Sequence, residues 1–256
     1  MPACQPRGRF EHLGLVYRVS NQVQAQFSLL FANAIMPLRR RASFLDAGAG
    51  DGTLTARIAP FFGRCVALEP DATRKQALLG LPCRARVETC TIEEYEPPAG
   101  EAYDLVHSSH VLYYISRDRW VATCLRMASW LAPGGVLAIV LQSRDGQFQD
   151  LFDRHSSLAG LVDPSALATE LRDAGLDVQE ASSAITFSCA TLGELRDAAM
   201  LMLVDPRDRL APSVPAIEAW LSATCKRPLA GYSMVQPITM LCARHGPGGT
   251  PRVGTG

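Results

Sequence analysis

The segment Phe44–Leu54, which reads FLDAGAGDGTL, combines the residue types that a small-ligand site needs. A short apolar run leads into glycines at positions 48, 50 and 52, and a helical pattern follows them. Glycine is required where backbone passes close beneath a ligand or adopts a positive φ angle. The segment therefore predicts a strand, a ligand-binding loop and a helix, with Asp46 and Asp51 flanking the loop.

The spacing and the charge of this loop distinguish two classes of ligand. A dinucleotide loop follows G-x-G-x-x-G, but here the third glycine is Gly52, and Thr53 stands where that pattern needs glycine. The two aspartates would repel a pyrophosphate and attract a ligand that carries an ammonium and a sulfonium group. S-adenosylmethionine (SAM) is such a ligand, so the loop favours SAM, with NAD as the alternative.

Glu69 follows the next apolar run, 17 residues after Gly52. A carboxylate at the carboxyl end of a second parallel strand can accept hydrogen bonds from both hydroxyls of a ribose. Because SAM and NAD both contain a ribose, Glu69 predicts an adenosine site without choosing between them.

These motifs, together with the segment LAPGG at 131–135, resemble those of class I SAM-dependent methyltransferases over residues 44–141. The resemblance implies an α/β, Rossmann-like, seven-stranded and mostly parallel sheet in the order 3-2-1-4-5-7-6, with strand 7 antiparallel and helices on both faces. It also places a polar segment after strand 3 beside the adenine. The cofactor-binding residues that we expect are Asp46, Gly48, Gly50, Gly52, Glu69, Pro70, Thr91, Ile92 and Ser109.

The segment 107–115, HSSHVLYYI, follows the fourth apolar run, where an open parallel sheet opens toward its ligand. Nucleobase methyltransferases carry a D/N-P-P-Y/F segment there, and this chain does not. The segment is similar to that of histamine N-methyltransferases, as are the stretches at 69–72 and 163–176. This resemblance implies a lidded pocket for a small amine, with substrate contacts at Gln22, His110, Tyr114 and Gln236. The family's carboxylate is Gln22 here and its amide is His110, so histamine itself is not the expected substrate.

Methyl transfer needs an unprotonated nucleophile held in line with the methyl group. His110 could accept a proton or a hydrogen bond, and the ring of Tyr114 could line the pocket or face a cation, so both are candidate catalytic residues. The leading hypothesis is a SAM-dependent methyltransferase acting on a nitrogen of an amine or imidazole-type metabolite. The alternatives are a hydroxyl or thiol acceptor and a non-catalytic SAM-binding domain.

The elements that would position these residues follow from the hydrophobic pattern. A helical stripe over 13–35 ends at Pro37, and short continuous apolar runs then alternate with helical stretches at about 52–60, 71–80 and 117–131. This alternation predicts a parallel sheet covered on both faces. A capped helix is expected from Asp163 to Gly175. The remaining expected elements are a strand at 178–187, helices at 191–203 and 214–225, and a strand at 233–243, with 190–230 as a small cap.

Composition excludes several classes of protein. The chain has 256 residues, with 25 basic and 25 acidic side chains, which argues against a general nucleic-acid binder. No apolar run approaches the roughly 20 residues that span a bilayer, and the first residues lack the apolar core of a signal peptide. Eight cysteines without a C-x-x-C pair fit free thiols in the cytoplasm, and no metal site is expected. We expect one domain over 10–245 between disordered ends at 1–9 and 246–256; the oligomeric state stays open.

Overall fold

The computed structural model describes residues 16, 18–155, 163–203, 213–228 and 231–246. The segment 1–9 and all but the first residue of the tail 246–256, both expected to be disordered, lie outside the described residues. The chain forms two compact units. The larger unit contains residues 26–141, 163–182 and 239–256, and the smaller unit contains residues 1–25, 142–162 and 183–238.

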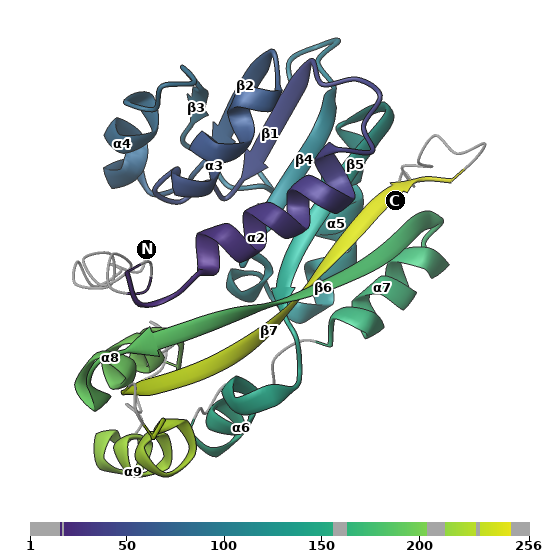
Figure 1. Cartoon of the computed structure of the whole chain (residues 1–256). Coiled ribbons are helices and arrows are strands. Elements are labelled where there is room, and N and C mark those ends of the chain that lie inside the picture. The colour runs from purple at the N-terminus through teal and green to yellow at the C-terminus, as the bar shows by residue number, and fades with distance from the viewer. Residues whose placement is uncertain (1–15, 17, 156–162, 204–212, 229–230, 247–256) are drawn as a thin grey trace. The chain divides into compact units, whose positions relative to one another are not determined.

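The strands form a sheet in the order β3-β2-β1-β4-β5-β7-β6 with β7 antiparallel, which confirms the expected fold (Figure 1). Strands β1 to β5 pair in parallel, and Asp46 of β1 lies opposite His107 of β4. The parallel strands β1, β2, β4 and β5 are almost entirely buried, as expected for a sheet covered on both faces. The strand bounds are β1 Ser43–Ala47, β2 Arg64–Leu68, β3 Arg86–Glu88, β4 Tyr103–Ser109, β5 Leu131–Gln142, β6 Leu176–Cys189 and β7 Tyr232–His245.

Most of the expected helices are present with small shifts at their ends. Asp163 caps α7 as predicted: its carboxylate accepts hydrogen bonds from the backbone N–H groups of Ser165 and Ala166. The described α-helices are α2 Gln22–Leu30, α3 Thr53–Ile58, α4 Lys75–Leu79, α5 Trp120–Ser129, α6 Gly146–His155, α7 Pro164–Asp173, α8 Leu192–Leu203 and α9 Val214–Cys225. Helices α8 and α9 belong to the smaller unit, and their role as a substrate cap stays a prediction.

Two expectations about the elements were wrong, and one strand had no expected position. The helix over 13–35 is interrupted at Ser20, which forms a β-bridge to Phe187 within the smaller unit, and it finishes as a π-helical turn over Phe31–Ile35. The segment 131–135, which we expected to precede a strand at 135–141, belongs to β5 itself, whose pairing with β4 shifts register between Tyr103 and Leu105. Strand β3 is only three residues long, too short for an apolar pattern to reveal.

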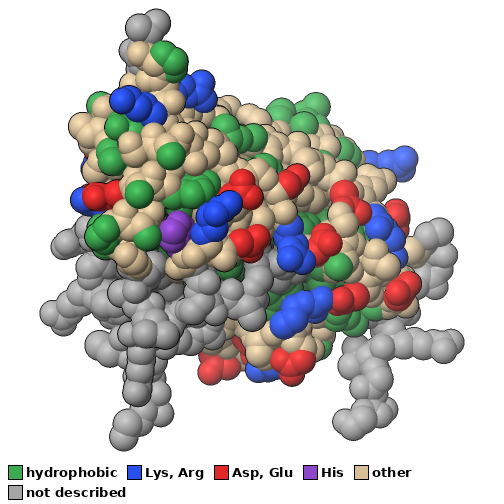
Figure 2. Space-filling view, turned by 90° about the horizontal axis from the view of Figure 1, so that it is seen from below, with side chains coloured by type: hydrophobic (Ala, Val, Ile, Leu, Met, Phe, Trp, Pro, Cys, Tyr) green, Lys and Arg blue, Asp and Glu red, His purple; other side chains and the backbone are tan. Residues whose placement is uncertain are grey.

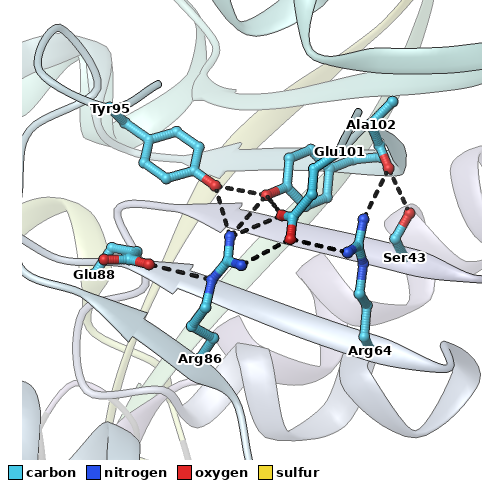
Figure 3. A network of polar contacts seen from close by, with 8 residues as sticks. Ser43, Arg64, Arg86, Glu88, Tyr95, Glu101 and Ala102 are labelled. Atoms are coloured by element: carbon cyan, nitrogen blue, oxygen red, sulfur yellow. Dashed lines mark hydrogen bonds and ion pairs between the residues drawn. The ribbon is translucent and has the colours of Figure 1, made fainter. Parts of the chain in front are cut away.

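A polar network joins the amino-terminal ends of the strands in the larger unit (Figure 3). The Arg86 guanidinium donates to both carboxylate oxygens of Glu101, at 2.8 Å each, and also contacts the hydroxyl of Tyr95. Glu101 in turn pairs with Arg64, and the Tyr95 and Tyr103 hydroxyls lie 2.5 Å apart. Paired, charge-assisted bonds of this kind fix geometry. The network therefore anchors the edge of the sheet opposite the carboxyl ends of the strands.

The surface shown in Figure 2 carries basic and acidic side chains intermingled, in keeping with the zero net charge. Within the part of the chain that the structure describes, no helix is both long enough and apolar enough to cross a membrane. The described cysteines are free thiols, and five of them are buried.

Candidate active site

The loop between β1 and α3 is held against the carboxyl end of β2. The backbone N–H groups of Gly48 and Ala49 both donate to the carbonyl oxygen of Leu68, at 3.0 and 2.9 Å. Gly48 has a φ of +89°, and a Cβ atom there would lie 2.3 Å from Cγ2 of Val111. No other residue fits this position, because both the backbone conformation and the space exclude a side chain. Gly48 thus lets the backbone of the loop pack directly against the side chain of Val111.

Glu69 lies beside this loop at the end of β2. Its side chain is buried, Oε2 accepts from the Gly50 N–H at 2.8 Å, and Oε1 accepts from the Asp71 N–H at 3.0 Å. Burial raises the pKa of Glu69, and the charge of Arg74 and the two N–H donors oppose that rise. The carboxylate therefore sits beside Gly50, where a ribose next to the loop would meet it.

Arg74 is a residue of this site that the sequence did not single out. Its Nη1 lies 3.4 Å from Oε2 of Glu69, and a Cβ atom on Gly50 would come within 3.3 Å of the same nitrogen. The guanidinium thus covers part of the loop and pairs with the carboxylate expected to bind ribose.

Asp46 faces the interior of the larger unit rather than the surface of the loop. It is 2% exposed; its Oδ2 accepts from the Thr55 hydroxyl at 2.6 Å, and its Oδ1 lies 2.9 Å from Nδ1 of His107. This group ties β1, α3 and β4 together at the base of the glycine loop. The Asp51 carboxylate accepts from the Thr53 N–H at 2.9 Å, so both flanking aspartates already have partners within the chain.

The other residues expected at the cofactor differ in exposure. Pro70 is exposed, next to Glu69. Thr91 and Glu94 form a reciprocal capping box, in which each side chain accepts from the backbone N–H of the other residue. Ile92 is 4% exposed, so its side chain packs in the interior. Of this group, Pro70 and the polar atoms around Thr91 are the parts that a ligand could reach.

His110 follows the carboxyl end of β4 and has an unusual backbone. Its φ is +56°, in the left-handed region, and its N–H donates to the carbonyl oxygen of Val140 on β5. The side chain is half-buried, and burial lowers its pKa from 6.5 to about 4, with a smaller contribution from His107. The ring is therefore neutral near pH 7.

A buried amide contacts His110. Nε2 of Gln26, on α2, lies 2.8 Å from Nε2 of His110, and Oε1 of Gln26 accepts from the Ser109 hydroxyl at 3.2 Å. Sequence reasoning singled out Gln22, one helical turn earlier, and missed Gln26. The available signal was a glutamine four residues after Gln22, since residues at that spacing share one face of a helix.

The aromatic ring beside His110 belongs to Tyr113. The two ring centroids are 6.0 Å apart with an interplanar angle of 26°, whereas Tyr114 is 58% exposed. The sequence Leu-Tyr-Tyr does not indicate which tyrosine packs against His110, because both belong to a single 3₁₀ turn. Gln22 and Gln236 belong to the smaller unit, and their contact with substrate stays a prediction.

Comparisons with known proteins agree with this geometry. The profile of a family described as "Methyltransferase domain" matches residues 18–181. Among solved structures, a candidate methyltransferase from Bacillus halodurans C-125 has a TM-score of 0.60 at 16% identity, covering 85% of this chain and 97% of that one. The DhpI–SAH complex has a TM-score of 0.55 at 17% identity, covering 94% and 92%. A search among curated proteins finds no match.

The family match spans well over half of the chain and includes the glycine loop, Glu69 and His110. The solved structures, at this low identity, add agreement in fold. The chain belongs to the methyltransferase domain family, and it is a SAM-dependent methyltransferase.

Proposed function

We propose that this methyltransferase acts on a small molecule at nitrogen, in an amine or imidazole-type group. SAM supplies the electrophilic methyl group on its sulfonium. The residues that we assign to holding it are the glycines at 48, 50 and 52, with Glu69, Pro70, Thr91 and Ser109, while the buried side chain of Ile92 supports the segment that carries Thr91. The observation that supports nitrogen most directly is the neutral, weakly basic ring of His110 beside Ser109.

The basicity of His110 bears on the acceptor atom. A ring with a pKa of about 4 is a poor acceptor for the proton of a hydroxyl group, whose own pKa is near 10 even in a phenol. A neutral amine or imidazole carries a lone pair already and needs positioning rather than deprotonation. The site is therefore better suited to a nitrogen nucleophile than to an oxygen nucleophile.

Substrate contacts are assigned to Gln22, His110, Tyr114 and Gln236, by resemblance to histamine N-methyltransferases. The absence of a carboxylate at Gln22 favours a substrate without a permanent ammonium group there. Tyr114, with 58% of its surface exposed, has a ring face available to a ligand.

The experiment that tests the proposal compares acceptors and variants. Wild type, His110→Gln and His110→Ala are assayed with labelled SAM against amines of near-neutral pKa, phenols and thiols. We expect transfer to amines, lowered by about fivefold in His110→Gln because one hydrogen bond of about 1 kcal/mol is altered. Transfer to phenols alone, abolished in both variants, would establish an oxygen acceptor instead.

The same assay separates the non-catalytic alternative. A SAM-binding domain without activity would bind labelled SAM but transfer nothing to any acceptor or to a metabolite extract. Binding of NADH without binding of SAM would contradict the cofactor assignment itself.

A further inference from the structure

Three polar side chains of the larger unit form a chain of hydrogen bonds: Ser109, Gln26 and His110. The Ser109 hydroxyl donates to the carbonyl oxygen of Gln26, and the amide nitrogen of Gln26 lies 2.8 Å from Nε2 of His110. Gln26 is 4% exposed, so its amide has little water to replace either partner. An amide placed this way is fixed at both ends.

The chemistry of the amide then determines the state of the imidazole. An amide nitrogen can only donate, so Nε2 of His110 must accept. A neutral imidazole has one acceptor nitrogen and one N–H, so the proton of this ring sits on Nδ1. Within the described part of the chain, Nδ1 has no hydrogen-bond partner, and the ring face is packed on Tyr113.

We propose that Gln26 is a positioning residue that holds His110 in its Nδ1–H form, so that the ring offers the substrate a hydrogen-bond donor beside the nitrogen that takes the methyl group. This inference rests on the proposed function and deepens it. The substrate group that meets Nδ1–H must carry a lone pair other than the one that takes the methyl group, as a carbonyl oxygen or a second ring nitrogen does. An alkylammonium, which has only N–H donors, would face another donor and is selected against.

Ser109 is the second partner of the Gln26 amide. Its hydroxyl donates to Oε1 at 3.2 Å, which leaves the amide nitrogen for His110. A hydroxyl can also accept from an amide turned by 180°, and His110 would then carry its proton on Nε2, so the tautomer of His110 distinguishes the two orientations.

The direct test is the tautomer of His110, read from two-bond 15N–1H correlation spectra of protein labelled at the histidine rings. His110→Gln identifies the signal by its loss. We expect a neutral ring at pH 7 with an unprotonated Nε2. A wild-type ring protonated on Nε2, or on both nitrogens, would overturn the proposal.

Substitutions at position 26 extend the test. In Gln26→Glu the carboxylate only accepts, so the proton moves to Nε2 and the pKa of His110 rises. In Gln26→Leu the fixed tautomer is lost, and kcat/KM for a neutral amine falls by about tenfold. Gln24→Leu, the same change at an exposed position of α2, serves as the control and keeps the wild-type signal.

Calorimetric titration with SAM shows whether each variant keeps a folded cofactor site. A fall in kcat/KM of Gln26→Leu with an unchanged His110 signal would show a merely structural role and overturn the proposal. If wild type methylates no amine at all, the proposed function fails, whereas the tautomer is still decided by the spectrum alone.

Discussion

Replacement of Glu69 by Gln is expected to weaken SAM binding without unfolding the protein. The carboxylate is buried beside the glycine loop, and its oxygens accept from the N–H groups of Gly50 and Asp71. Burial raises its pKa, which means that the ionised form carries a desolvation cost in the folded state near pH 7. Removal of the charge relieves that cost, but the amide turns an NH2 group toward one of the two N–H donors, so we expect a loss of at most about 1–3 kcal/mol in the free energy of unfolding, which leaves the protein folded.

The magnitude follows from the bonds that the carboxylate can form with a ribose. A hydrogen bond to a charged group contributes about 1.5–3 kcal/mol, and the amide keeps one acceptor oxygen but loses the charge. A net loss of one such bond corresponds to roughly 10- to 100-fold weaker binding. The ion pair of Glu69 with Arg74, whose side chains are 8% and 19% exposed, competes with the ribose and brings the expected loss toward the lower end of this range.

Calorimetric titration of SAM and its demethylated product measures the effect. Glu96→Gln is the matched control, because Glu96 is a carboxylate whose side chain is 75% exposed and pairs with Arg126 on the surface. Its affinity for SAM should equal that of wild type. If folded Glu69→Gln binds SAM within threefold of wild type, the ribose assignment is wrong.

Three further predictions concern neighbouring residues. Arg74→Met removes the cation that competes for Glu69 and should tighten SAM binding up to about fivefold by calorimetry; weaker binding would mean that Arg74 itself contacts the cofactor. Thr55→Val leaves the buried Asp46 carboxylate without its hydroxyl donor and should cost about 1.5–3 kcal/mol in urea unfolding, against less than about 0.5 kcal/mol for Thr169→Val on the exposed face of α7. Because the pKa of His110 lies below its unfolded value, its neutral form contributes stability that is present above about pH 6.5 and lost as pH falls toward 4. His110→Gln should therefore reduce the loss of unfolding free energy between pH 7.5 and 5 by at most about 2 kcal/mol, and an unchanged pH dependence would contradict the lowered pKa.

The fold could be predicted because its signals are local. Continuous apolar strands between helices indicate a covered parallel sheet, and a capping aspartate followed by proline marks the start of α7. The glycine loop was recognisable for the same reason, since Gly48 meets a steric requirement that one residue type alone can satisfy.

Side-chain partners were harder to predict from the sequence, because they depend on which elements meet in space. Nothing near Asp46 in sequence shows that its carboxylate pairs with His107, 61 residues away. The Asp46 carboxylate was expected to face a ligand at the loop, but it lies in the interior of the larger unit instead. Gln26 and Arg74 were missed similarly: each is an ordinary polar residue of a helical segment until the fold brings it to His110 or Glu69.

The left-handed backbone at His110 shows how local conformation depends on side-chain contacts from other elements. A residue other than glycine at a φ of +56° costs of order 1 kcal/mol, and it persists only where its surroundings determine the conformation. Here the N–H of His110 is held by Val140, its ring by Gln26 and its ring face by Tyr113. Glycine would meet the backbone requirement without strain but would lose all contacts of the ring. The strain is therefore offset by interactions of the imidazole. These interactions also fix the orientation of the neutral ring at the end of β4.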